Sequence, residues 1–220
     1  MGKYIKNIRD IFLLIFLFLF PLHFCSANIN DARELFLKGE YIKAIKLCKK
    51  IDTLESQILQ SRIISIHSYF FKEGKPAELA YLEAYEIAKK IIKNNDKLAE
   101  AHVELAHALG RYGQEIGIMS AISKGIADEV KHHLLLALKL DEDNVIASLS
   151  LGVWHSEITN KAGKVLANLV YGAKAERARF FLRKALKINN DQIGVLFEVA
   201  RGFLLLESQE DIKFSKKLFN

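Results

Sequence analysis

The sequence predicts an all-α fold, a right-handed α-α superhelix in which antiparallel helix pairs stack side by side. The first observation is a repeated phrase: residues 137–144 read ALKLDEDN, and residues 185–192, 48 positions later, read ALKINNDQ. Repetition at a fixed period is typical of stacked repeat architectures. The second is composition, because half of the 220 residues are hydrophobic and only 2 are proline and 12 glycine. This mixture favours a packed helical protein over a disordered one.

Residues 1–27, MGKYIKNIRDIFLLIFLFLFPLHFCSA, have the order of a secretory signal peptide: a basic start, the apolar run Ile11–Phe20 and a small-residue cleavage site. We place cleavage after Ala27 and expect an exported, periplasmic protein. The competing interpretation is an uncleaved membrane anchor, but a spanning helix needs about 20 apolar residues. Lipidation at Cys25 is a weaker alternative, because the residue before this cysteine is bulky.

The charge of the chain does not indicate a nucleic-acid-binding protein. The formal net charge is +6, and removing residues 1–27, with three basic residues and one acidic residue, leaves about +4. Basic and acidic residues are interspersed along the predicted helices, as on a solvated surface. The mature part keeps one cysteine, Cys48, which cannot form an internal disulfide and is expected to be a small buried hydrophobe.

Two helix pairs are predicted near the start of the mature chain. Residues 32–51 read ARELFLKGEYIKAIKLCKKI, with small and apolar residues at helical spacing on either side of a glycine. A weaker pair runs from about residue 56 to residue 95, with EAYEIAKKIIKNND as its second helix. Both segments therefore favour helix–turn–helix units.

The repeated phrases end two further amphipathic helices, whose apolar residues recur on one face. These residues are Val130, Leu134, Ala137 and Leu138 in the first helix and Ala178, Leu182, Ala185 and Leu186 in the second. Each helix stops at an Asp/Asn cluster, and a new apolar stripe follows, ASLSLGVWHSEI or VLFEVARGFLLL. We count about four helix pairs and a partial C-terminal pair, in one domain over residues 28–220.

These units resemble the tetratricopeptide repeat, a unit of 34 residues made of helix A and helix B. The family pattern places a small residue late in helix A, and Ala106, Gly152 and Ala200 fall there. The phrase GEYIKAI is similar to the family's turn into helix B. Two features depart from the pattern: the proline that commonly closes the unit is absent, and the spacing between the three small residues is 46 and 48.

The additional residues form two insertions between helix A and helix B, roughly Tyr112–Ala127 and Thr159–Lys174. Both contain apolar residues and glycines. Long apolar loops in water are costly, so we interpret the insertions as lengthened helices joined by ordered apolar elbows.

The combination LGVWHSEI…LVYGAKAERARFFLRKALKINN…FEVARGFLLL is also similar to the tetratricopeptide region of the regulator of microtubule dynamics family and its bacterial relatives. This resemblance implies elongated helix pairs. We carry over the fold alone, because an exported protein would not meet microtubules.

Stacked pairs leave a concave wall, made mainly by the A helices, whose side chains are free to bind a partner. The predicted groove residues are His107, Arg111, Trp154, His155, Glu157, Phe197 and Arg201. The same wall is expected to include Val103, Leu149, Val153, Ser156 and Leu204. Aromatic and arginine side chains there would anchor an extended peptide or a helix. The competing interpretation is that Trp154 packs against the neighbouring insertion.

The sequence indicates no enzyme, cofactor or metal. In HVELAH the histidines His102 and His107 are five apart, roughly 140° around a helix, whereas the zinc motif HExxH needs them four apart. Neither a phosphate-binding loop nor a nucleophile–base arrangement can be identified. We therefore predict a protein or peptide as the partner, with membrane contact only through the cleaved signal peptide.

The leading hypothesis is an exported, non-catalytic scaffold that captures a protein or peptide in the groove. The alternative is a small-ligand-binding or transport-accessory protein whose pocket is formed by the insertions, near Trp154 and Tyr171. A third option is an assembly subunit that self-associates through apolar surfaces of the insertions.

Overall fold

The computed structural model describes residues 28–218, and in this range every regular element is helical. The predicted signal peptide lies outside the described residues. The helices before the first insertion are α2 (Ile29–Leu37), α3 (Tyr41–Ile51), α4 (Leu54–Phe71), α5 (Lys75–Asn94) and α6 (Ala99–Glu115). The remaining elements are α7 (Ile118–Ser123), α8 (Ile126–Leu140), α9 (Val145–Ala162), α10 (Lys164–Leu166), η1 (Ala167–Tyr171), α11 (Ala175–Ile188), α12 (Ile193–Leu204) and α13 (Gln209–Lys217).

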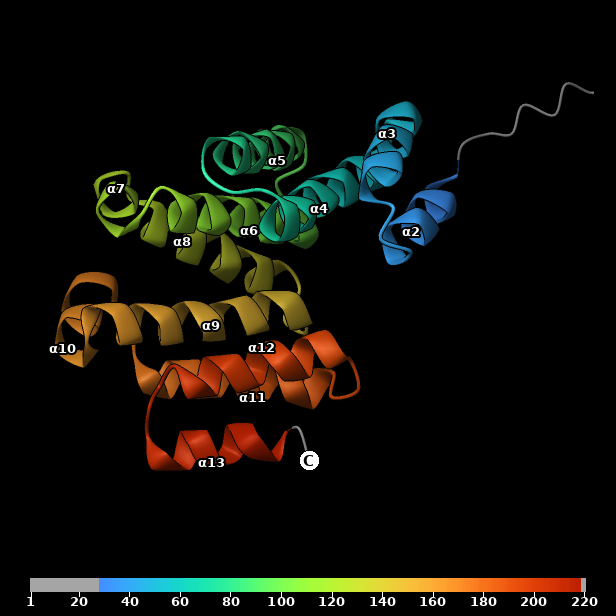
Figure 1. Cartoon of the computed structure of the whole chain (residues 1–220). Coiled ribbons are helices and arrows are strands. Elements are labelled where there is room, and N and C mark those ends of the chain that lie inside the picture. The colour runs from blue at the N-terminus through green and yellow to red at the C-terminus, as the bar shows by residue number, and fades with distance from the viewer. Residues whose placement is uncertain (1–27, 219–220) are drawn as a thin grey trace, which may run out of the picture.

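The helices form stacked antiparallel pairs, as Figure 1 shows. The A helices are α2, α4, α6, α9 and α12, and their B partners are α3, α5, α8, α11 and α13. The last pair, α12 and α13, has a short B helix. The prediction of an all-helical repeat protein is confirmed for the described part of the chain.

Side-chain caps define where several helices begin. Asn28 and Thr53 each accept a hydrogen bond from a backbone N–H of the following helix and form capping boxes at the start of α2 and α4. Asn144, in the Asp/Asn cluster after α8, caps α9 in the same way through the Ala147 N–H. The polar cluster predicted to stop α8 thus also starts α9.

Small residues allow close contact between the A and B helices, as predicted. A Cβ atom added at Gly152 on α9 would lie 2.7 Å from the side chain of Leu182 on α11. Ala106 and Ala200, at the equivalent places in α6 and α12, are 2% and 1% exposed. The main apolar core lies at α6, α8, α9 and α11, and includes Leu134 and Trp154.

The two insertions are ordered elbows with the same construction. The first elbow contains α7 and is bounded by Gly117 and Gly125; the second contains α10 and η1 and is bounded by Gly163 and Gly172. All four glycines have positive φ, which only glycine adopts readily. Both elbows lie on the same side of the stack in Figure 1.

The elbows do not bury all their apolar side chains. Ala167 and Ala173 are fully buried, whereas Val165 and Leu169 are 82% and 81% exposed. The reason is that an elbow of short helices can turn only one face to the core. None of the helices in residues 28–218 combines the length and the apolar character needed to span a bilayer.

Candidate functional site: the A-helix face

Side chains of successive A helices contact one another along one surface, which we call the A-helix face and define by α4, α6, α9 and α12. The hydrogen-bonded pairs on it are separated by 42 to 44 residues, about one repeat. These pairs are Arg62–Glu104, His107–Ser150, Gln114–Glu157 and Glu157–Arg201. Polar groups on neighbouring A helices are thus bonded to each other at several levels along these helices.

Arg111 on α6 contributes a positive charge to this face and contacts residues of α4 and of its own helix. Its guanidinium carbon is 4.0 Å from the centre of the Tyr69 ring on α4, and its Nη1 donates to Oε1 of Gln114 at 3.0 Å. Cation–π contact holds the guanidinium in place without neutralising it. In the described part of the chain Arg111 has no carboxylate partner within salt-bridge distance. The arrangement leaves a fixed positive charge on the surface.

Glu157 on α9 joins three A helices. It accepts hydrogen bonds from Nε2 of Gln114 on α6 at 3.1 Å and from Nη1 of Arg201 on α12 at 2.9 Å. Burial alone would raise the pKa of Glu157, but the hydrogen bond from Arg201 and the nearby positive charges of Lys161 and Arg201 outweigh it. The pKa of Glu157 is therefore lowered, and this carboxylate is charged at neutral pH.

His107 is neutral in this surface. Its Nε2 is 2.7 Å from Oγ of Ser150 on α9. Burial, and then the charges of Arg111 and Arg62, lower the pKa of His107 to about 3. His107 therefore serves as a hydrogen-bonding group rather than a charge at physiological pH.

Phe197, Arg201 and Leu204 occupy one face of α12, and Phe197 and Leu204 are 53% and 46% exposed. Arg201 is held by Glu157 and also by Glu198, at 2.8 Å. The predicted groove residues are therefore on the helices that form the A-helix face: His107, Arg111, Glu157, Phe197 and Arg201. Gln114 links Arg111 to Glu157, and Glu157 bonds directly to Arg201.

Three residues expected on the wall are instead part of the core, so that expectation is wrong. Val103 is 2% exposed and packs with Ala137 of α8, and Leu149 is 7% exposed and packs with Leu182 of α11. Ser156 is fully buried. These positions turn toward helix B, because an A helix between two B helices has a wide buried sector.

Trp154 and His155 also lie away from the A-helix face, which corrects their placement in the groove. Trp154 is 8% exposed, and its Nε1 donates to the backbone oxygen of Ala127, at the start of α8, at 3.1 Å. The competing interpretation, that this tryptophan packs against the neighbouring insertion, is confirmed. His155 is 5% exposed and stacks on Phe181 of α11, with the ring centres 5.9 Å apart.

The chemistry available on the A-helix face is that of recognition. It combines an exposed tyrosine, a guanidinium without a carboxylate partner, an exposed phenylalanine and a chain of hydrogen bonds. His102, five residues before His107, turns elsewhere and meets His133 of α8, with their Nδ1 atoms 2.7 Å apart. Among residues 28–218 no cluster of three His, Cys, Asp or Glu side chains has the geometry of a metal site.

Sequence reasoning missed Tyr69, Gln114 and Glu198. Tyr69 and Gln114 could have been found from the sequence interval between contacting residues on successive A helices, which is shorter than the 46 or 48 residues between equivalent positions. Glu198 instead contacts Arg201 of its own helix. A polar residue about 43 positions from another on the preceding A helix is a candidate for this face.

Comparisons with known proteins agree with this architecture. The family model described as "Regulator of microtubule dynamics protein 1-3" matches residues 28–211. The chain is also similar to the crystal structure of a thermophilic tetratricopeptide repeat protein of Thermus thermophilus, with a TM-score of 0.55 and 13% identity. That likeness covers 87% of this chain and 96% of the other, and at this identity it concerns the fold alone. No curated protein matches the sequence.

Proposed function

Since this chain belongs to the family of regulator of microtubule dynamics proteins 1–3 and has a tetratricopeptide-like fold, we propose that it is a non-catalytic scaffold that binds a protein or peptide through the A-helix face. The observation that carries the proposal is the hydrogen-bonded connection from Arg111 through Gln114 and Glu157 to Arg201. It fixes polar groups of three helices in one surface before any partner arrives. Preorganisation of this kind reduces the entropic cost of binding.

The side chains around this connection favour a segment with acidic and apolar residues. Arg111 offers a positive charge on the ring of Tyr69, and Phe197 offers an exposed aromatic surface. Arginine and aromatic side chains dominate binding energy at protein interfaces. A carboxylate on the partner would pair with Arg111, while an apolar side chain would cover Phe197.

The proposed function is tested by site-specific photocrosslinking in cells that make the protein. A benzoylphenylalanine residue replaces Phe197 on the A-helix face or, as a matched control, Phe180 on α11, because these two phenylalanines are 53% and 54% exposed. We expect a discrete crosslinked partner from position 197 and not from position 180. The charge reversal Arg111→Glu should abolish the crosslink, whereas Lys187→Glu on α11 should leave it unchanged.

A crosslink of equal strength from both positions that also survives Arg111→Glu would rule out binding through this face. Recovery of the same partner by purified protein, mixed with the purified partner, then establishes direct contact. Loss of the crosslink in Lys187→Glu as well would indicate a general charge effect and count against the proposal.

Export is a further part of the proposal and rests on residues 1–27. A protein delivered across a membrane would have its partner in that compartment, so we carry over no microtubule partner from the family name. Cell fractionation and the intact mass of the purified protein test this part. We expect a periplasmic chain that begins at Asn28; a cytoplasmic full-length chain would contradict it.

A further inference from the structure

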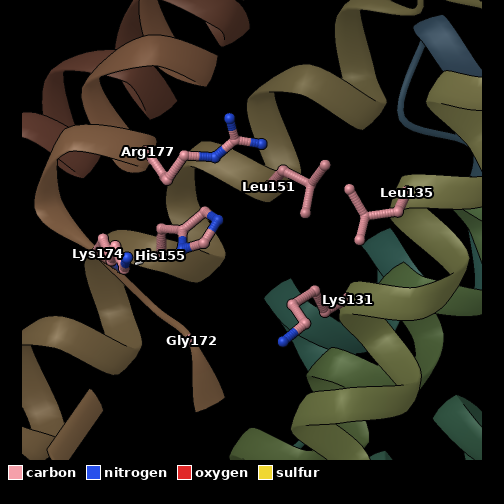
Figure 2. Close-up of a pocket in the computed structure, with 7 residues that line it drawn as sticks. All are labelled: Lys131, Leu135, Leu151, His155, Gly172, Lys174 and Arg177. Atoms are coloured by element: carbon pink, nitrogen blue, oxygen red, sulfur yellow. Dashed lines mark hydrogen bonds between the residues drawn. The ribbon is translucent and has the colours of Figure 1, made fainter. Parts of the chain in front are cut away.

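A pocket lies on the other side of α9, away from the A-helix face. Its lining comes from α8, α9, the end of the second elbow and the start of α11, and its volume is about 350 Å³. Figure 2 shows Arg177 and His155 on one side of the pocket and Lys131 and Leu135 across from them. Leu151 lies between the two sides. This volume is within the range of small-ligand sites, which begin at about 300 Å³.

A comparison of the repeats singles out His155. The small residues Ala106, Gly152 and Ala200 mark the same place in α6, α9 and α12, and the residues three positions later are Leu109, His155 and Phe203. Leu109 and Phe203 are apolar core residues, 6% and 0% exposed. His155 is equally buried but polar, so the repeat replaces a core side chain by a hydrogen-bonding one only where the pocket is.

The hydrogen bonds of His155 leave one donor directed at the pocket. Its Nδ1 accepts from the backbone N–H of Lys174 at 3.2 Å, so the proton of the neutral ring is on Nε2. Figure 2 shows the second ring nitrogen turned toward the pocket. Nε2 makes no hydrogen bond within the described residues. Burial, and then the charges of Arg177 and Lys131, lower the pKa of His155 to about 4, so the ring is neutral at pH 7.

The pocket is positive and contains no acidic side chain among the residues described as lining it. Arg177 lies over the ring of Phe181, with its guanidinium carbon 4.7 Å from the ring centre, and has no carboxylate partner in residues 28–218. Lys131 differs, because its Nζ donates to the backbone oxygen of Tyr171 at 2.6 Å and lies 4.0 Å from Asp128. The groups free to bind a ligand are therefore the Arg177 fork and the His155 N–H, with Lys174 at the rim.

We propose that this pocket binds a small aliphatic carboxylate, with its carboxylate on Arg177 and His155 Nε2–H and its chain against Leu135. The charged guanidinium of Arg177 and the neutral N–H of His155 can each donate to the oxygens of a carboxylate, which carries a single negative charge. Leu135, which is 44% exposed, supplies an apolar wall for a short chain, with the fully buried Leu151 behind it. This site is separate from the proposed protein-binding face and does not depend on it.

The chain carries its own reporter for this test. Trp154 is the only tryptophan in the sequence and stands edge-on to His155, with ring centres 4.9 Å apart. Binding is measured by titrating the purified protein with hexanoate and following Trp154 fluorescence, with calorimetry as a second measurement. Hexanol, hexylamine and hexyl phosphate, which keep the chain and change the head group, are titrated in parallel.

We expect saturable binding of hexanoate that is stronger than that of the other three compounds. Arg177→Gln should weaken it about tenfold, the effect of losing one charged hydrogen bond, and Lys174→Gln should weaken it less. Lys187→Gln removes the same charge from an exposed position of α11 and should change the affinity less than about twofold. Arg177 and Lys174 are both exposed, so these variants should fold, and thermal melting checks this.

Three results would overturn the proposal: no saturable binding of hexanoate, equal or tighter binding of hexylamine or hexyl phosphate, or an equal loss of affinity in Arg177→Gln and Lys187→Gln. None of them bears on the crosslinking experiment, so failure of this site and failure of the protein-binding face are distinguishable.

Discussion

Glu157 of α9 and Arg201 of α12 form an ion pair across neighbouring A helices, with Oε1 and Nη1 2.9 Å apart. The glutamate is 17% exposed and the arginine 33%. Arg201 is also paired with Glu198 of its own helix. The pair therefore belongs to a network that joins two repeats and is partly shielded from solvent, which distinguishes it from an isolated surface salt bridge.

Replacing Glu157 by Gln is expected to lower the free energy of unfolding at pH 7 by about 1 kcal/mol, because the charge-assisted bonds become neutral ones. The pKa of Glu157 is lowered in the folded state, so its stabilisation is present above the unfolded pKa near 4.5 and is lost as the pH falls through the folded value. Urea unfolding of both proteins at pH 7 and pH 3 measures the difference. A difference that does not shrink at pH 3 would contradict the assigned ion pair.

The Arg62–Glu104 pair connects α4 and α6 and contains a buried carboxylate. Glu104 is 1% exposed and accepts from Nε of Arg62 at 2.8 Å, while its Oε2 has no partner in the described residues. We expect Arg62→Leu to destabilise the protein by about 3 kcal/mol, because it leaves an unpaired buried charge. Arg62→Leu/Glu104→Leu should recover most of this loss. Urea unfolding of the three proteins tests the expectation, and a double variant no better than the single one would refute it.

Acid should destabilise the fold from a pH near 6.5 downward. The pKa values of His107, His133 and His155 are lowered to about 3, 4 and 4, in each case mainly by burial. The unfolded chain binds protons near pH 6.5 whereas the folded chain does not, so stability is complete above about 6.5 and is lost as the pH falls toward 4. Each histidine contributes a slope of at most about 1.4 kcal/mol per pH unit.

The measurement is a series of urea unfolding curves between pH 7.5 and pH 4.5, with His107→Gln as the comparison. The free energy of unfolding of this variant should depend less steeply on pH, because unfolding takes up one proton fewer when one of the three histidines is absent. An unchanged slope would show that His107 is protonated in the folded protein. His132 of α8 is exposed, so His132→Gln is the matched control for the substitution itself.

The fold could be predicted from the sequence because its signals repeat. The phrase at Ala137 recurs at Ala185, and the small residues at 106, 152 and 200 mark close helix contacts in three units. The elbows were also predictable as ordered, since both insertions contain many apolar residues and long apolar loops in water are costly. Periodicity identifies which residues share a helix face, and stacked repeats depend on little else.

The candidate site was harder to predict because a helical stripe does not say which neighbour it meets. Val103 and Leu149 lie one turn before His107 and Val153, on nearly the same side of their helices, yet they are buried in the core. His155 and Glu157 are two residues apart and face opposite sides of α9, one toward α11 and one toward α6 and α12. Such a distinction depends on the angle between helices, which no single helix encodes.

The thiol of Cys48 should be unreactive in the folded protein. This side chain is fully buried in the core of the first pair, and burial raises its pKa to about 11. Since the thiolate is the reactive form, we expect negligible labelling by a disulfide reagent at pH 8 in native buffer and complete labelling in urea. Rapid labelling without denaturant would contradict the packing of α3 against α4.

Gly152 is expected to tolerate no larger side chain, because the Leu182 contact leaves no room for one. A Cβ at this position would lie 2.7 Å from the Leu182 side chain and 3.0 Å from its backbone nitrogen, and Leu182 is fully buried. Gly152→Ala should therefore lower the free energy of unfolding by about 2 kcal/mol, despite the better helix propensity of alanine.

Gly194→Ala on α12 is the matched control, since nothing lies within 4 Å of its added Cβ. The control should gain about 0.5 kcal/mol from helix propensity alone. Thermal and urea unfolding of both variants compare the two effects, and equal stabilities would mean that α9 and α11 are not in close contact at this position.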